Sequence, residues 1–170
     1  LRALAPHLPP ELQTQALSEA LAAARQIQNE YWRANALRDL APHLPPELRT
    51  QALTEALAAT HQLPETGMFG HSPRLAALRD LAPHLPPERL GEALAAARQI
   101  QNERYRAKAL RALAPYLPPE LQTQALTEAL AAARQIQDEE YRADALRALA
   151  PHLPPELQTQ ALSEALAAAR

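Results

Sequence analysis

Cysteine is absent from the 170-residue chain, which excludes a disulfide framework and thiolate metal sites. This absence fits the cytosol, the nucleus and the periplasm equally, and we expect a cytoplasmic location. No apolar run approaches the roughly 18 residues of a membrane-spanning helix. We therefore expect a soluble protein that has no membrane partner.

Neither sign of charge dominates, because 17 Lys and Arg stand against 19 Asp and Glu and the formal net charge is −2. Such a chain has no global field to attract phosphate backbones, which speaks against nucleic acid as a partner. Glycine is scarce as well, and the closest pair, Gly67 and Gly70, does not fit a phosphate-binding loop. Without a Ser/His/Asp, Cys/His or paired-acid arrangement, we predict no enzyme, no catalytic residues and no cofactor.

What the chain does contain is an internal repeat. Leu1 to Arg25 and Leu146 to Arg170 are the same 25 residues, and degenerate copies lie between them. The tripeptide LAP recurs with spacings of 36, 41, 32 and 36 residues, starting at Leu4, Leu40, Leu81, Leu113 and Leu149. A repeated unit that cannot bury its apolar face alone must stack on its neighbours. The basic unit is therefore a structural repeat of 36 residues.

Each unit reads as a long helix, a short polar break, a second helix and a proline turn. Of the 17 prolines, 15 belong to the recurring LAPxLPP turn, where they end one helix and begin the next. At the internal break, Asn29, Ser72, Asn102 and Asp138 are suited to cap the second helix. The long helix carries an apolar arc wide enough to touch neighbours on both sides. These features predict an all-α fold, a right-handed α-solenoid of antiparallel helix-turn-helix repeats.

The predicted boundaries follow the proline turns, and the whole chain, 1–170, is expected to be one repeat domain cut from a longer array. Residues 1–9 would be a partial second helix and 155–170 an unpaired first helix. The full helical hairpins are predicted at 10–45, 46–86, 87–118 and 119–154.

The second and third units depart from the basic length. The third loses four residues near the start of its first helix and places Gly91 on the solvent-facing side. The second gains five residues between His61 and Ser72, a loop that holds the apolar pair Met68 and Phe69. This pair is either tucked against the stack or presented to a partner, and the sequence favours neither.

The period and the A-L, A-A and R-A-x-A-L spacings resemble the tetratricopeptide-like superfamily of solenoids. The Trp and Gly-Tyr signature of the strict tetratricopeptide is absent, and the aromatic residue stands instead at the start of the second helix, as Trp32, Tyr105 and Tyr141. Near-identical units are also similar to repeat sensor or scaffold arrays of bacterial multidomain signalling ATPases. That resemblance implies ligand sensing or protein docking, and it assigns no individual residue.

Two arginine series are candidate functional residues. The first lies within the apolar arc of the second helix, where burial favours a structural ion pair with glutamates of the neighbouring hairpins over a ligand-facing role. Its members are Arg33, Arg74, Arg106 and Arg142. The second series projects from the polar face of the first helix, and the second unit has Thr60 in its place. These arginines either line a groove that binds a partner or are present only because the helix dipole favours a positive charge near the C-terminus. The members of this series are Arg25, Arg98, Arg134 and Arg170, and the partner-binding candidates are the first three of these together with Met68 and Phe69.

Histidines recur in the proline turn, but equivalent positions of stacked hairpins are about 10 Å apart, too far for one zinc ion. The series is His7, His43, His84 and His152, with Tyr116 in the fourth copy. His61 and His71 bracket the long loop, yet two imidazoles without a third ligand make a poor site. We predict no metal.

The leading functional hypothesis is a scaffold or ligand-sensing module that binds a peptide or protein partner on its curved surface. The first alternative is head-to-tail self-association through the uncovered end helices, which would not close. A pentatricopeptide-like RNA-binding array is a further alternative, against which the near-neutral charge counts.

Overall fold

The computed structural model describes residues 10–67 and 71–168, and this part of the chain is helical without a strand. The all-α prediction is therefore confirmed. The nine α-helices of the described residues are α1 (Pro10–Arg25), α2 (Glu30–Leu40), α3 (Pro46–Thr60), α4 (Pro73–Leu81), α5 (Pro87–Arg98), α6 (Glu103–Leu113), α7 (Pro119–Arg134), α8 (Glu139–Leu149) and α9 (Pro155–Ala168). The partial helix predicted at 1–9 lies outside the described residues.

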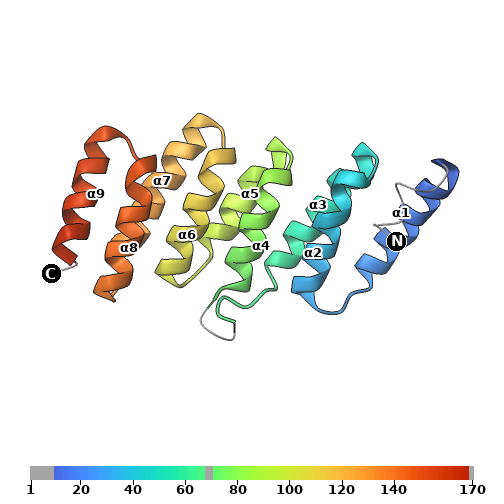
Figure 1. Ribbon diagram of the computed structural model, residues 1–170, viewed down its shortest axis with the longest axis horizontal. Helices are drawn as coiled ribbons and strands as arrows, with labels where there is room; N and C mark the ends of the chain where they lie inside the picture. Colours follow the sequence, from blue (N-terminus) through green and yellow to red (C-terminus); the bar gives the residue numbers. More distant parts are fainter. Residues whose placement is uncertain (1–9, 68–70, 169–170) are drawn as a thin grey trace.

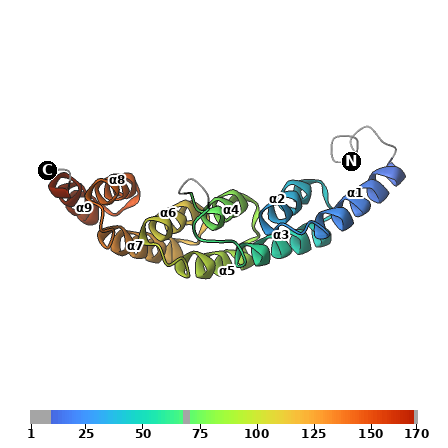
Figure 2. The same cartoon turned by 90° about the horizontal axis from the view of Figure 1, so that it is seen from below.

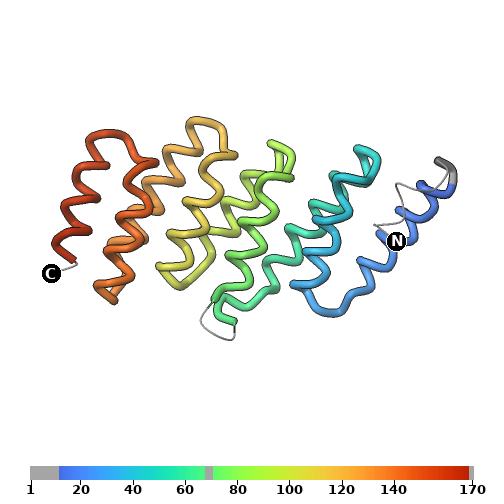
Figure 3. Tube along the Cα trace, in the orientation of Figure 1, coloured from blue at the N-terminus to red at the C-terminus, as the bar shows by residue number. Residues whose placement is uncertain are grey.

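The helices form a row of two layers that follows the chain from one end to the other (Figure 1, Figure 3). Turned by 90°, the row is an arc: α1, α3, α5, α7 and α9 lie along its outer side, and α2, α4, α6 and α8 lie along its inner side (Figure 2). We call these the outer and the inner layer. Each inner helix packs on the outer helices before and after it in the chain, and α2, α4, α6 and α8 also contact one another in sequence.

The inner helices begin where a side chain caps them. The carboxamide oxygen of Asn29 accepts a hydrogen bond from the Trp32 amide at 3.1 Å, and the hydroxyl oxygen of Ser72 accepts one from the Leu75 amide at 3.2 Å. Asn102 and Asp138 cap α6 and α8 in the same way. The predicted capping role of these four residues is confirmed.

The proline turns have one local structure. A three-residue 3₁₀-helix with proline at its second position continues the end of each inner helix, and the next outer helix starts at the last proline of the turn. These short helices are η2 (Ala41–His43), η4 (Ala82–His84), η5 (Ala114–Tyr116) and η6 (Ala150–His152). Proline suits both places because its fixed φ is helical and its missing N–H is not needed in a first turn.

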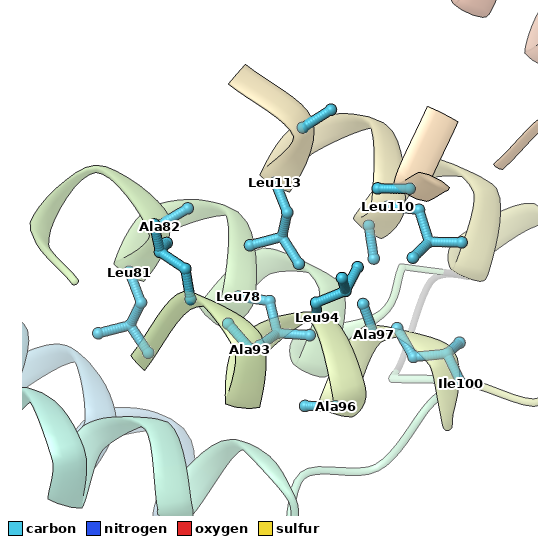
Figure 4. Close-up of a cluster of buried hydrophobic side chains, with 14 of the residues drawn as sticks. Leu78, Leu81, Ala82, Ala93, Leu94, Ala96, Ala97, Ile100, Leu110 and Leu113 are labelled. Atoms are coloured by element: carbon cyan, nitrogen blue, oxygen red, sulfur yellow. The ribbon is translucent and has the colours of Figure 1, made fainter. Parts of the chain in front are cut away.

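Leucine and alanine fill the space between the layers. Leu78, Leu94, Leu110 and Leu113 point toward one another from α4, α5 and α6, and alanines such as Ala93 occupy the places where helices approach closely (Figure 4). Small alanine side chains permit this approach, and each fully buried leucine contributes about 1.5–3 kcal/mol of hydrophobic stabilisation. The buried cluster extends from Leu21 in α1 to Ala165 in α9.

The second unit is the irregular one. Its inner helix α4 has 9 residues, whereas α2, α6 and α8 have 11 each, because Ser72 and Pro73 start it one half-turn later. Among the helices of the described residues, none is long and apolar enough to cross a membrane.

Candidate functional site

One arginine series joins successive outer helices. Arg25 at the end of α1 donates through Nε and Nη2 to both carboxylate oxygens of Glu55 in α3, at 2.8 and 2.7 Å. Arg98 and Arg134 make the same two-pronged contact with acids of the following outer helix, Glu128 and Glu164, at 2.7–2.9 Å. The three guanidinium groups proposed as partner-binding are thus held in ion pairs within the outer layer.

These pairs shift the pKa of their members in the expected directions. Hydrogen bonding to Glu55, Glu128 and Glu164 raises the pKa of the three arginines. The hydrogen bond from Arg134 lowers the pKa of Glu164. The arginine side chains are 38–39% exposed and the glutamate side chains 32%, so each pair is a surface contact with a small contribution to stability.

The second unit holds His61, and not Thr60, at the arginine position. Thr60 is fully buried and donates its hydroxyl to the Leu57 carbonyl at 2.7 Å, as suits the place of the buried Ala97 and Ala133. The exposed residue that follows it is His61. The sequence interpretation that placed Thr60 in the arginine series was shifted by one residue, because Thr60 replaces the third alanine of the run and His61 replaces the arginine that follows it.

The other arginine series binds backbone carbonyls of the short segments that follow the outer helices. Arg106 donates to the carbonyls of Ile100 and Gln101 at 2.7 and 2.8 Å, and Arg142 donates to those of Ile136 and Gln137. Arg33 and Arg74 bind carbonyls at the end of the preceding helix or in its loop in the same manner. Carbonyls just beyond a helix end have no intrahelical partner, so one arginine there satisfies several acceptors at once.

The acids paired with this series are not those expected from sequence. Arg33 and Arg142 pair with Glu30 and Glu139, one turn earlier on the same helix, and Arg74 lies 3.6 Å from Glu65 in the preceding loop. The glutamates of neighbouring hairpins pair instead with Arg25, Arg98 and Arg134. The spacing in sequence identified the residues, but it did not indicate which acid each would meet.

An aromatic hollow lies where α2 begins. Trp32 is 62% exposed, and the neighbouring Tyr31 ring meets it edge-on with the centroids 5.2 Å apart. Together with residues of the α3–α4 loop and of α4, among them Leu63, Pro64 and Pro73, they surround a hollow of about 660 Å³. Its lining is largely apolar, and Tyr105, the counterpart of Trp32 in α6, is by contrast buried.

The α3–α4 loop beside this hollow is fastened to the next unit. The Glu65 carboxylate accepts hydrogen bonds from the backbone amides of Gln101, at 2.9 and 3.0 Å, and of Asn102, at 3.3 Å. Gly67 closes the loop by donating its amide to the His71 carbonyl at 2.7 Å. Pro64, Gly67 and His71 of this longer loop therefore line one wall of the hollow. Met68 and Phe69 lie outside the described residues.

A second concavity, of about 220 Å³, lies between α6 and α8 in the inner layer. The guanidinium carbon of Arg104 stands 3.5 Å from the centroid of the Tyr141 ring, a cation–π contact between successive inner helices. Lys108 and Arg111 line the same cleft, and Asp144 is the acid that faces them from α8. The floor is apolar and includes Ala107 and Leu149. We refer to this site as the α6–α8 cleft.

The positive charges of the cleft are poorly compensated. Burial lowers the pKa of Lys108, and the nearby Arg104 and Arg111 lower it further against the attraction of Asp144. Asp144 itself accepts a hydrogen bond from Arg147 at 2.8 Å. Among the described residues, the structure shows no hydrogen bond or ion pair to Lys108 or Arg111.

Sequence reasoning missed the α6–α8 cleft, although a signal was present. Arg104, Lys108 and Arg111 follow the i, i+4, i+7 spacing of one helix face, and no other inner helix has three cations there. The corresponding residues are Tyr31, Asn35 and Arg38 in α2, Ser72, Ala76 and Arg79 around α4, and Glu140, Asp144 and Arg147 in α8. A comparison of units position by position would have singled out α6.

No cluster of three histidine or acidic side chains suited to a metal ion occurs in residues 10–67 and 71–168. The comparisons with protein-family models, with curated proteins and with solved structures gave no match to the chain.

Proposed function

We propose that the chain is a binding scaffold that holds a peptide or protein partner on the inner layer, and that it is not an enzyme. Its fold would be a right-handed α-solenoid of about 36-residue helical hairpins, related in style to tetratricopeptide-like arrays. The sequence period and the two-layered arc support this proposal. The observation that carries the binding role is the exposed Trp32 over the hollow at the start of α2.

An exposed tryptophan over an apolar concavity has a clear physical use. Trp and Tyr supply large, rigid contact area at little cost in side-chain entropy, and they are enriched at the centres of protein interfaces. Tyr31 and Trp32 stand together at the hollow, and Leu63 provides a buried apolar wall. An apolar side chain of a partner peptide would displace water from this surface and gain hydrophobic stabilisation.

Trp32 also gives the test, since it is the only tryptophan of the chain. Peptides selected on the immobilised protein from a random display library should shift the Trp32 emission to shorter wavelength when they bind. Trp32→Ala should weaken the selected peptides about tenfold or more, the usual effect of truncating a central aromatic contact. Trp32→Tyr, which installs the residue found at Tyr105 and Tyr141, should keep part of the affinity.

Tyr116→Ala is the matched control, because this exposed aromatic lies in the proline turn η5 and does not line the hollow. If the selected peptides bind the wild type and Trp32→Ala equally well and leave the emission unchanged, the binding site is elsewhere. Failure to select any peptide with a saturable affinity would contradict the scaffold role itself.

Self-association is the second candidate, and the exposure of α9 favours it. Leu162 and Leu166 are 41% and 66% exposed, whereas Leu126 and Leu130, their counterparts in α7, are buried under α8. The sequence of α9 repeats that of α1, whose equivalent face contacts α2. The surface therefore fits an inner helix of a second copy, and Leu166→Glu should abolish any rise of mass with concentration in light scattering. A mass that stays constant for the wild type would contradict this candidate.

A further inference from the structure

Beyond the general binding role, the α6–α8 cleft has the chemistry of an anion site. We propose that it anchors a side-chain carboxylate from an acidic segment of the peptide partner, an inference that rests on the proposed scaffold function. Arg104, Lys108 and Arg111 would supply the charge, and the apolar floor would take the aliphatic stem of a glutamate.

The first support is the preorganisation of Arg104. Its guanidinium carbon lies over the Tyr141 ring, 3.5 Å from the centroid, so the ring restricts the side chain, and among the described residues no hydrogen bond from its N–H groups is seen. Arginine is suited to this role because its planar fork matches the two oxygens of a carboxylate. A guanidinium fixed in advance loses less side-chain entropy when the anion binds.

The second support is the unbalanced charge. Three cations share one face of α6 at spacings where like charges destabilise a helix by about 0.2–0.5 kcal/mol per pair. The facing acid, Asp144, is bonded to Arg147 and so compensates the cluster only in part. A partly buried cationic cleft with apolar walls concentrates the field and attracts an anion.

The third support is that the cluster is dispensable for the fold. The counterpart of Lys108 is Ala76 in α4 and Asn35 in α2, and the counterpart of Arg104 is Glu140 in α8, yet these helices occupy equivalent places in the inner layer. Lys108 and Arg104 are therefore not needed at these places for an inner helix to pack. A charge arrangement that lowers local stability, and that the other units do without, is typical of a functional position.

The experiment measures binding of acetylated, amidated hexaglutamate to the wild type by calorimetry, with hexaglutamine as the uncharged peptide. Hexaglutamate should bind and weaken with added salt, and hexaglutamine should not bind. Lys108→Ala and Arg104→Glu, each of which installs a residue from another unit, should reduce the affinity about tenfold or more. Arg79→Ala is the matched control, because Arg79 occupies the position of Arg111 on α4 and pairs with Asp80.

A direct readout is the titration of the Lys108 ammonium group by NMR. Bound carboxylate should raise the pKa of Lys108, which burial and its cationic neighbours now lower. Equal affinity of hexaglutamate for the wild type and Lys108→Ala, or an unmoved Lys108 titration, would overturn the assignment. Binding of inorganic phosphate alone would overturn the carboxylate specificity, and binding of a uridine hexanucleotide in preference to hexaglutamate would identify an RNA site instead.

The two proposals fail in different ways. If library-selected peptides shift the Trp32 emission, contain no acidic residues and bind Lys108→Ala as well as the wild type, the scaffold role stands and the anion site is wrong. If hexaglutamate binds through Lys108 while no peptide responds to Trp32→Ala, the cleft is an anion site and the hollow at α2 is not the partner surface.

Discussion

At the residue scale, both arginine series recur along the repeat, but they bind different groups. Arg98 binds a carboxylate of the next outer helix, whereas Arg106, eight residues later, binds carbonyls of the break that follows α5. Carbonyls in such a break have no intrahelical partner, and a partly buried arginine satisfies them. The series of Arg25, Arg98 and Arg134 instead links one unit to the next through solvent-exposed ion pairs.

The second unit lacks the arginine–glutamate pair that joins successive outer helices, and we predict that a single substitution supplies it. His61 stands at the position of Arg25 and Arg98, and Glu92 in α5 stands at the position of Glu55 and Glu128, but Glu92 pairs with Arg89. His61→Arg should form the missing pair and stabilise the chain by about 0.2–1 kcal/mol.

The check is a double-mutant cycle of His61→Arg with Glu92→Gln, followed by urea unfolding. Coupling between the two positions should fall as salt is added, because the pair is exposed. If no coupling is measurable at low salt, α3 and α5 do not place positions 61 and 92 as close together as α1 and α3 place Arg25 and Glu55.

The lowered pKa of Glu164 predicts an acid-sensitive contact at α9. Because the hydrogen bond from Arg134 holds the folded-state pKa below that of an unfolded glutamate, the contact stabilises fully above the unfolded pKa. This stabilisation is lost as the pH falls below the pKa of Glu164 in the unfolded chain and then through its pKa in the folded protein. Protection of the α9 amides, corrected for the intrinsic exchange rate at each pH, should fall over this interval in the wild type, and Glu164→Gln should remove that part of the pH dependence. Identical profiles for the two proteins would contradict the prediction.

At the scale of the element, most helix ends could be predicted. Proline fixes the starts of the outer helices, and Asn29, Ser72, Asn102 and Asp138 cap the inner ones as their side chains indicate. The acidic partner of each arginine could not be predicted, because the pairing depends on which helix lies opposite the arginine. The two concavities also escaped prediction, because they form between units and not within one.

The glycines of the irregular units give an element-scale prediction. Gly91 lies within α5, and a Cβ built there meets nothing within 4 Å. Gly91→Ala should therefore stabilise the protein by about 1 kcal/mol, the difference in helix propensity. Gly67→Ala is the contrasting variant, because its Cβ would lie 3.1 Å from the Pro73 ring and 3.2 Å from the His71 carbonyl.

Urea unfolding of the two glycine variants checks this expectation, with Gly91→Ala above the wild type in stability and Gly67→Ala below it. If Gly91→Ala has no effect or destabilises, the helix at this position does not have the regular, open surface that the structure shows.

At the scale of the whole molecule, the arc separates two kinds of surface. The outer layer holds the exposed arginine–glutamate pairs, whereas the inner layer holds both the aromatic hollow at α2 and the α6–α8 cleft. The repeat pattern in the sequence indicated a curved surface, but it did not show which helix of each unit would face inward. That choice depends on the packing of all the units together.

The placement of the binding surface is the central claim, and chemical-shift mapping of a selected peptide on the isotopically labelled protein tests it most directly. We expect the perturbed resonances to fall on the inner layer, at Tyr31 and Trp32 and along α6 and α8. The side-chain signals of Arg25, Arg98 and Arg134 should not move. Perturbations confined to these arginines and the outer helices would contradict the account and place the partner on the opposite face of the arc.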